Sequence, residues 1–262
     1  MRRTIRSALA GPVPDMAGGG VSYEDAATPD GMRLYAIGDV HGRADCLADL
    51  LDLIETEIAR DRPADWRLIF LGDYVDRGTD SAGVIEMIAS RTRTDRRYVA
   101  LKGNHDKVFA EFLAGPAMWA QFLDFGGEST ALSYGVEIDF STDETIRRSR
   151  DALLAAVPET HLVFLNGLRL SASIGDFFFC HAGIRPDVPL DMQSEHDLIW
   201  IRHEFHDHAG LYPKLVVHGH TPHDEPEVRT NRVNIDTHAF ATGRLTALAM
   251  DGREKRFLET SR

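Results

Sequence analysis

Cysteine is scarce in this sequence, and long apolar runs are missing from it. The two cysteines, Cys46 and Cys180, form no CxxC pair, which excludes a zinc site built from paired thiolates. We expect both to be reduced, largely buried thiols in a cytoplasmic protein. No apolar stretch approaches the length that a membrane-spanning helix needs. The first residues also lack the apolar core of a secretory signal peptide.

Positive charge is also in short supply. Lys and Arg number 29 against 41 Asp and Glu, which gives a formal net charge of -12. So acidic a surface disfavours nucleic acid and anionic membranes as partners. Phosphate esters stay open as ligands, because salt screens distant charges and a local basic pocket acts at close range.

The composition is that of a globular protein with a sizeable core. The chain has 262 residues, of which 43% are hydrophobic, and this favours one large domain. Residues 1–31 include a run of three glycines and several prolines, so we interpret them as a flexible leader. Residues 32–262 form the predicted domain. Within it, residues of about 115–170 mix helical segments with glycines and are interpreted as a helical insertion.

Short apolar strands alternate with amphipathic helices in the first half of this domain. Apolar residues at helical spacing predict helices over 47–58, 80–88 and 108–113, with Asp80 as the N-cap of the second. Short apolar runs predict buried strands at 34–37, 68–71, 98–101, 176–180, 214–217, 232–235 and 245–250. The pattern is typical of the α/β class.

Polar clusters follow five of these strands at the point where each strand ends. They occupy residues 38–42, 72–78, 103–106, 181–183 and 218–221. Because ligands of α/β proteins gather where strands end and loops begin, the five clusters imply one shared site. Side chains two apart in an extended segment point the same way, so Asp39 and His41 can hold one ion. Asp73 ends the central strand and is best placed to bridge two ions.

Three neutral side chains complete this predicted ligand set: Asn104, His181 and His220. Each motif taken alone is more often a turn or a structural histidine than a metal site. Their joint occurrence at equivalent strand ends makes chance a poor explanation. Oxygen and imidazole ligands without sulfur favour Mn, Fe or Zn over a pure Mg or Ca oxygen cage.

The five clusters read GDVHG, GDYVDRG, GNHD, HAGI and HGHT, and in this order they resemble the phosphoprotein phosphatase family of metallophosphoesterases. The similarity extends over residues 33–250. Residues 126–135 and 198–202 also resemble segments of the bacterial serine/threonine protein phosphatases. The resemblance implies two mixed β-sheets packed as a sandwich and flanked by helices, the calcineurin-like fold.

The resemblance also implies a role for individual residues. Asp73 would be shared by two divalent metal ions, Mn most readily. The first ion would be held by Asp39, His41 and Asp73, and the second by Asp73, Asn104, His181 and His220.

The same resemblance gives roles to four further residues. His105 resembles the general acid, and Asp76 resembles the residue that orients it. Arg77 and Arg202 resemble the clamp on the phosphate.

Three residues near these motifs receive no catalytic role. His218 is interpreted as structural, and Asp106 stands where eukaryotic members carry Glu. His238 replaces a glycine of bacterial relatives and is interpreted as a surface substitution.

The predicted function is hydrolysis of phosphate monoesters by a metal-bridging hydroxide. The expected substrates are phosphoserine and phosphothreonine in proteins, with phosphotyrosine and small phosphate esters as further candidates. Symmetrical diadenosine tetraphosphate hydrolysis is the alternative; those hydrolases commonly lack the Asp before Arg that Asp76 provides. An inactive phosphate-binding module is the alternative of another class, and the complete set of site residues speaks against it.

Overall fold

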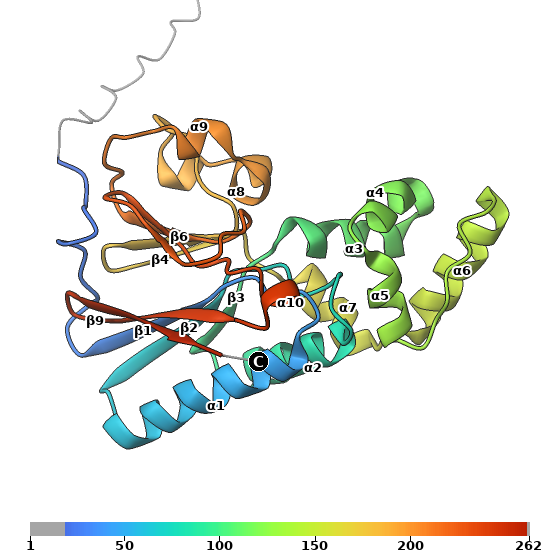
Figure 1. Cartoon of the computed structure of the whole chain (residues 1–262), viewed down its shortest axis with the longest axis horizontal. Coiled ribbons are helices and arrows are strands. Elements are labelled where there is room, and N and C mark those ends of the chain that lie inside the picture. Colours follow the sequence, from blue (N-terminus) through green and yellow to red (C-terminus); the bar gives the residue numbers. More distant parts are fainter. Residues whose placement is uncertain (1–18, 261–262) are drawn as a thin grey trace, which may run out of the picture.

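Two five-stranded mixed sheets pack face to face in the computed structural model, which describes residues 19–260 (Figure 1). The first sheet has the order β10-β9-β1-β2-β3, with β1, β2 and β3 parallel and β9 antiparallel to both β1 and β10. Its strands are β1 (Met32–Ile37), β2 (Asp65–Phe70), β3 (Tyr98–Ala100), β9 (Thr246–Asp251) and β10 (Glu254–Glu259). The predicted α/β sandwich is confirmed.

The second sheet has the order β4-β5-β6-β8-β7, in which β5, β6 and β8 are parallel. Its strands are β4 (Ser171–Ile174), β5 (Phe177–Cys180), β6 (Leu215–His218), β7 (Glu227–Val228) and β8 (Arg232–Asn234). All seven predicted strands are present. The strands β4, β7 and β10 escaped prediction because they lie at sheet edges, half exposed, and contain no continuous apolar run.

Helices cover the outer face of each sheet. Those on the first sheet are α1 (Ala44–Asp61), α2 (Ser81–Thr94) and α3 (Asn104–Ala114), which include the three predicted helices. The Asp80 side chain accepts a hydrogen bond from the Gly83 N–H at 2.8 Å, so its prediction as an N-cap is confirmed. The second sheet is covered by α8 (Glu195–Trp200) and α9 (His203–His206).

Strand alternation divides the core into layers. Tyr35 and Ile37 of β1 face the helices, whereas Leu34 and Ala36 face the second sheet. Phe177 and Phe179 of β5 meet them there, fully buried. Cys180 faces outward beneath α8 and α9; both cysteines are buried, and they form no disulfide with each other. Four layers, helices, sheet, sheet and helices, hold the strand ends in fixed positions.

Helical segments fill the stretch predicted as an insertion. They are η1 (Pro116–Met118), α4 (Trp119–Asp124), α5 (Gly127–Ser133), α6 (Asp143–Ala156) and α7 (Glu159–Asn166). In Figure 1 α6 lies farthest from the two sheets, whereas α7 returns toward α2.

The flexible leader was predicted to extend to residue 31, but its last residues are packed against the domain. Val21 forms a β-bridge with Tyr212, the Tyr23 N–H donates to the Thr230 carbonyl at 2.7 Å, and Ala26 is fully buried. These contacts attach residues 21–26 to loops beside the second sheet and to the core between the sheets, and residues 1–18 lie outside the described part. Within residues 19–260, no helix is both long and apolar enough to span a membrane.

The layer between the sheets supports a stability prediction. Phe179→Ala should lower the free energy of unfolding by about 3–5 kcal/mol, because it leaves a cavity where both sheets meet. Urea unfolding followed by circular dichroism measures this loss. Val228→Ala is the control, since Val228 is 41% exposed on an edge strand and should change stability by less than about 0.5 kcal/mol. Equal effects of the two changes would contradict this account of the core.

Candidate metal centre

The structure brings all six predicted metal ligands together at the strand ends. The loops after β1, β2 and β3 meet the ends of β5 and β6 there, and every one of these side chains is buried. His181 Nε2 lies 2.9 Å from Asn104 Oδ1 and 3.4 Å from Asp73 Oδ2. The backbone N–H of His220 donates to the Asp39 carboxylate at 3.1 Å. Residues far apart in the sequence therefore form one cluster, as the strand-end pattern predicted.

Asp73 stands at the centre of this cluster. Its Oδ2 lies 3.5 Å from His41 Nε2 and 3.9 Å from His105 Nε2, besides the contact with His181. Its Oδ1 accepts the backbone N–H of His105 at 3.0 Å. Two groups of candidate ligands share this carboxylate: one with His41 and His105, the other with His181 and His220. A carboxylate between two imidazole groups is the arrangement that a bridging ligand requires.

Hydrogen bonds orient the histidine rings. Nδ1 of His41 lies 2.8 Å from the Val75 carbonyl, and Nδ1 of His181 lies 3.1 Å from the Leu71 carbonyl. Each Nδ1–H therefore donates to the backbone, and Nε2 is directed to the cluster, the pattern of metal-binding imidazoles. His220 Nε2 is buried and has no hydrogen-bond partner within residues 19–260. A buried nitrogen without a partner costs free energy, so the donor set fits a metal.

The backbone is strained at this site. Positive φ angles occur at His41 (44°), Asp73 (53°), Asp76 (71°), Arg77 (68°) and His220 (68°). Residues other than glycine rarely adopt this left-handed region, and such strain concentrates at functional sites. The surrounding sandwich must hold these loops in place.

His105 and Asp76 form a buried pair. His105 Nδ1 lies 2.7 Å from Asp76 Oδ2, while Asp76 Oδ1 accepts the Thr130 hydroxyl at 2.7 Å. Burial lowers the pKa of His105 to about 4 and raises the pKa of Asp76 well above its usual value. Burial thus favours the neutral form of each group.

Asn104 and His105 were expected at the end of a strand, but the structure places them in a helix. They form the first turn of α3, where successive side chains are about 100° apart. Asn104 consequently faces His181, and His105 faces Asp76. The two side chains point apart because they are successive residues of a helix.

Sequence reasoning missed the roles of Asp106 and Thr130. The Asp106 carboxylate accepts the backbone N–H groups of Asp73, Tyr74 and Gly103, each at 2.9 Å, and so fixes the loop that carries Asp73. Thr130 lies in the segment 126–135, whose resemblance to bacterial relatives was the only indication of a role. It bonds both the carboxylate and the N–H of Asp76.

Half-buried aromatic side chains surround the cluster and were also missed. Phe125 stacks on His105 with ring centroids 4.0 Å apart, and Trp200 lies 5.9 Å from Phe125 and 6.3 Å from His220. Phe240 lies 5.7 Å from His41 on the other side. The centre therefore combines buried polar ligands with exposed aromatic surface.

The two predicted phosphate-binding arginines differ in placement. Arg77 lies against the cluster, 3.2 Å from both His41 Nε2 and His105 Nε2, with its guanidinium 4.8 Å from the Phe240 ring centroid. Arg202 is exposed, and its guanidinium donates a 3.4 Å hydrogen bond to the His220 carbonyl.

Two further histidines that were assigned no catalytic role, His218 and His238, lie near the cluster. His218 is buried against Phe205 and His206, which agrees with a structural role. His238 was interpreted as a surface substitution, yet it is half-buried and its ring packs 4.5 Å from that of Phe240.

Comparisons with known proteins agree with this geometry. The model of the Calcineurin-like phosphoesterase family matches residues 32–242. A bis(5'-nucleosyl)-tetraphosphatase PrpE [asymmetrical] of Halalkalibacterium halodurans is 28% identical over 233 residues, covering 83% of this chain and 89% of that protein.

Solved structures share the fold. One described provisionally as a diadenosine tetraphosphatase has a TM-score of 0.61 at 20% identity, covering 89% of this chain and 98% of its own. A protein serine/threonine phosphatase of Saccharomyces cerevisiae has a TM-score of 0.52 at 13% identity, covering 88% and 80%. The narrower assignment to phosphoprotein phosphatases stays a prediction. Because the family model spans most of the chain, including all six candidate ligands, this chain belongs to the calcineurin-like phosphoesterase family.

Proposed function

We propose that this chain hydrolyses phosphoric anhydride or ester bonds with two divalent metal ions, and that dinucleoside tetraphosphates are its main substrates. The buried cluster around Asp73 carries the proposal, because the other five predicted oxygen and imidazole ligands lie about this one shared carboxylate. The relatives named tetraphosphatases support the substrate class. This replaces protein phosphomonoesters, the substrates that the motifs favoured, as the first candidate.

Each metal would be held by its own set of side chains. Asp39, His41 and Asp73 would hold one ion, and Asp73, Asn104, His181 and His220 the other. Mn, Fe and Zn all suit this donor set. When bound, such a pair activates water as hydroxide and polarises phosphoryl oxygens.

The chain's own residues would bind and orient the substrate. Arg77 presents a planar fork beside the cluster, which suits two oxygens of a phosphate. Arg202, exposed and next to the His220 carbonyl, would bind the outer phosphates of a polyphosphate. Phe125, Trp200 and Phe240 offer faces on which an adenine can stack.

Phosphomonoesters in proteins are the second candidate, favoured by the Asp76–His105 pair. A serine alkoxide is a poor leaving group and needs a proton as it departs. In that reaction His105 would face the leaving oxygen while Asp76, held by Thr130, fixes the ring.

A comparison of substrates tests the proposed function. Manganese-loaded enzyme should hydrolyse diadenosine tetraphosphate with a higher kcat/KM than a phosphoserine peptide, and chelation should abolish both activities. Water attack at an outer phosphate gives AMP and ATP, as the relatives' asymmetrical activity implies; attack at the middle gives two ADP. Chromatography of the nucleotides distinguishes these products.

Three outcomes would change the conclusion. A higher kcat/KM on the phosphopeptide would indicate a protein phosphatase. Formation of two ADP from diadenosine tetraphosphate would indicate a symmetrical hydrolase. Binding of both substrates without turnover in metal-loaded enzyme would favour the phosphate-binding module. Asp73→Asn serves as the inactive control, because it weakens the carboxylate that both ligand groups share.

The role of His105 has its own test. If it donates the proton, His105→Asn should slow phosphoserine peptide hydrolysis by about 10²–10⁴. The loss on p-nitrophenyl phosphate should be clearly smaller, since nitrophenolate leaves unaided. Metal content should be unchanged. Loss of metal would instead make His105 a ligand, a role that its position beside His41 and Asp73 allows.

A pair of glycines tests the placement of Asp73. A Cβ at Gly103 would overlap Asp73 Oδ1 and the Asp73 nitrogen, whereas a Cβ at Gly115 would meet nothing within 4 Å. The two glycines flank the same helix, α3. Gly103→Ala should therefore lower manganese content and kcat by about tenfold or more, the effect of misplacing a reacting group by about 1 Å. Gly115→Ala should change neither. Normal metal content and rate in Gly103→Ala would contradict the assignment of Asp73.

A further inference from the structure

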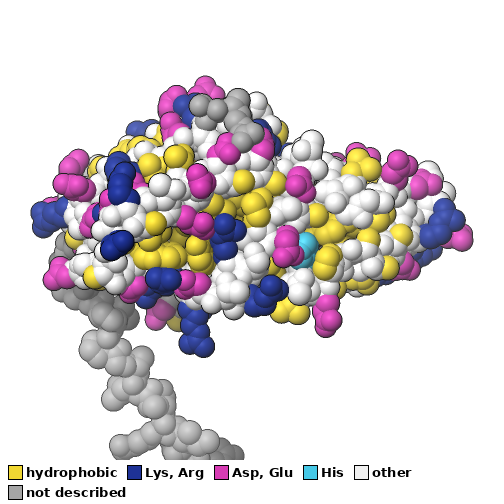
Figure 2. Space-filling model, turned by 90° about the horizontal axis from the view of Figure 1, so that it is seen from below, with side chains coloured by type: hydrophobic (Ala, Val, Ile, Leu, Met, Phe, Trp, Pro, Cys, Tyr) yellow, Lys and Arg dark blue, Asp and Glu magenta, His cyan; other side chains and the backbone are white. Residues whose placement is uncertain are grey.

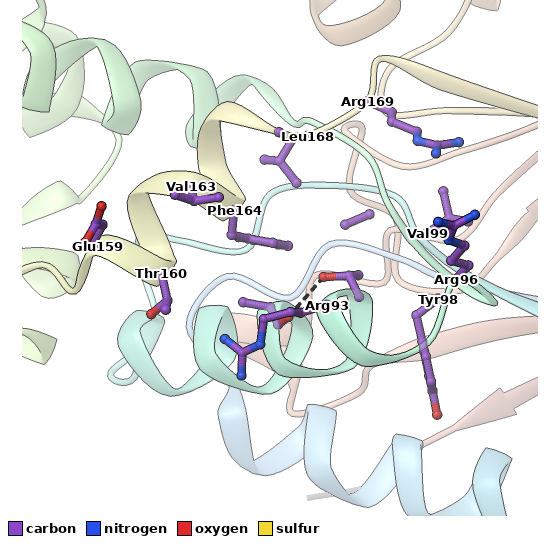
Figure 3. Close-up of a pocket in the computed structure, with 14 residues that line it drawn as sticks. Arg93, Arg96, Tyr98, Val99, Glu159, Thr160, Val163, Phe164, Leu168 and Arg169 are labelled. Carbon is purple, nitrogen blue, oxygen red and sulfur yellow. Dashed lines mark hydrogen bonds between the residues drawn. The ribbon is translucent and has the colours of Figure 1, made fainter.

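A second site lies between α2, β3 and α7. There the structure has a cavity of about 650 Å³, which shares no residue with the candidate metal centre. Figure 3 shows α2 on one side, α7 on the other, and the turn after α7 closing one end. Its volume lies in the range of about 300–1,000 Å³ that is typical of sites for small organic ligands.

Apolar side chains from four segments form the walls. They are Ala89 of α2, Val99 of β3, Phe164 of α7 and Leu168 of the following turn. Val163 stands at the border with 67% of its surface exposed, the second highest exposure among the large hydrophobic residues of the described part. Figure 2, seen from the side of α1 and α2, shows apolar patches bordered by basic side chains. Water in such a cavity is readily displaced by an apolar group.

Three arginines, Arg93, Arg96 and Arg169, also line the cavity. None of the three forms an ion pair with a described carboxylate, although Arg91 and Arg97 beside them are paired with Glu55 and Asp95 at 2.9 and 2.6 Å. All three side chains are exposed and can therefore bind an anion without first breaking an ion pair.

The charges are arranged asymmetrically along the cavity. Figure 3 places Arg96 and Arg169 at one end and Glu159 at the other, with Phe164 and Leu168 between. Arg93 lies along α2. One end of the cavity is therefore basic, the middle is apolar, and the acidic residue is remote from the two arginines.

We propose that this cavity binds a small amphiphilic organic anion. Its apolar body, an acyl chain or an aromatic ring, lies against Val99, Phe164 and Leu168. Its carboxylate or phosphate is bound by Arg96 and Arg169, whose guanidinium groups present paired donors to such oxygens. The unpaired arginines favour an anionic ligand over a neutral one, because a neutral apolar ligand would leave them without a partner.

Fluorescence titration with anilinonaphthalene sulfonate, an apolar ring system with one anionic group, tests the proposal. The probe should brighten on binding to the metal-loaded enzyme and be displaced by decanoate and by decyl phosphate. Decanol at the same concentration should displace it far less. Displacement by decyl phosphate alone would narrow the ligand to a phosphate, and by decanoate alone to a carboxylate.

The arginines are tested by a matched pair of double variants. Arg96→Gln with Arg169→Gln should weaken decanoate binding about tenfold or more, the value of a charged hydrogen bond expressed as an affinity. Arg147→Gln with Arg148→Gln removes two exposed arginines of α6 that likewise lack an ion pair in the described part, and should leave binding unchanged. Both variants should hydrolyse substrate at the normal rate, so this test is independent of the proposed function.

Three results would overturn the proposal. Equal decanoate affinity in the two double variants would show that the arginines do not bind the anion. Equal displacement by decanol would make the cavity a site for neutral apolar compounds. Unchanged probe binding in Ala89→Leu, a variant that narrows the cavity from α2, would place the probe elsewhere, provided that its Tm shows it to be folded.

Discussion

The carboxylate of Asp73 is the group on which the architecture of the centre depends. It is buried, and burial alone would raise its pKa; the neighbouring His181 instead holds the pKa of Asp73 well below its usual range. The N–H of His105 at the start of α3 adds a hydrogen bond, where a helix terminus favours negative charge. A buried anion of this kind is tolerated only if its partners stay in place. The sandwich of two sheets supplies that rigidity.

Close contacts make the placement of this anion intolerant of change. Gly103 lies against the Asp73 carboxylate, and Gly219 lies against that of Asp39, so that a Cβ at either would overlap an oxygen. Asp106 fixes the same loop through three backbone N–H groups. The helical insertion adds Thr130, which bonds Asp76. The strained backbone at the site is thus compensated by contacts from several elements.

The strand ends could be predicted from the sequence because buried parallel strands are continuous apolar runs, each followed by polar ligands. That pattern located all six candidate ligands around Asp73. The edge strands β4, β7 and β10 lack such runs and were missed. Thr130 could not be assigned, because it acts on Asp76 across 54 positions of the sequence. The cavity beside β3 was likewise invisible, since α2, β3 and α7 meet only in the folded chain.

The choice of substrate depends on surfaces that the motifs do not describe. Asp76 before Arg77 pointed to monoesters, yet the Asp76 carboxylate contacts His105, and this contact does not distinguish the two substrate classes. Arg77 also packs on Phe240, so one side chain joins the ligand cluster to the aromatic surface beside it. The aromatic face of Phe240 stabilises the positive charge of that guanidinium. A substrate with phosphates next to a base would meet both features together, whereas a phosphoserine peptide offers only the phosphate. The joined position of Arg77 and Phe240 is therefore the structural feature that most favours a nucleotide.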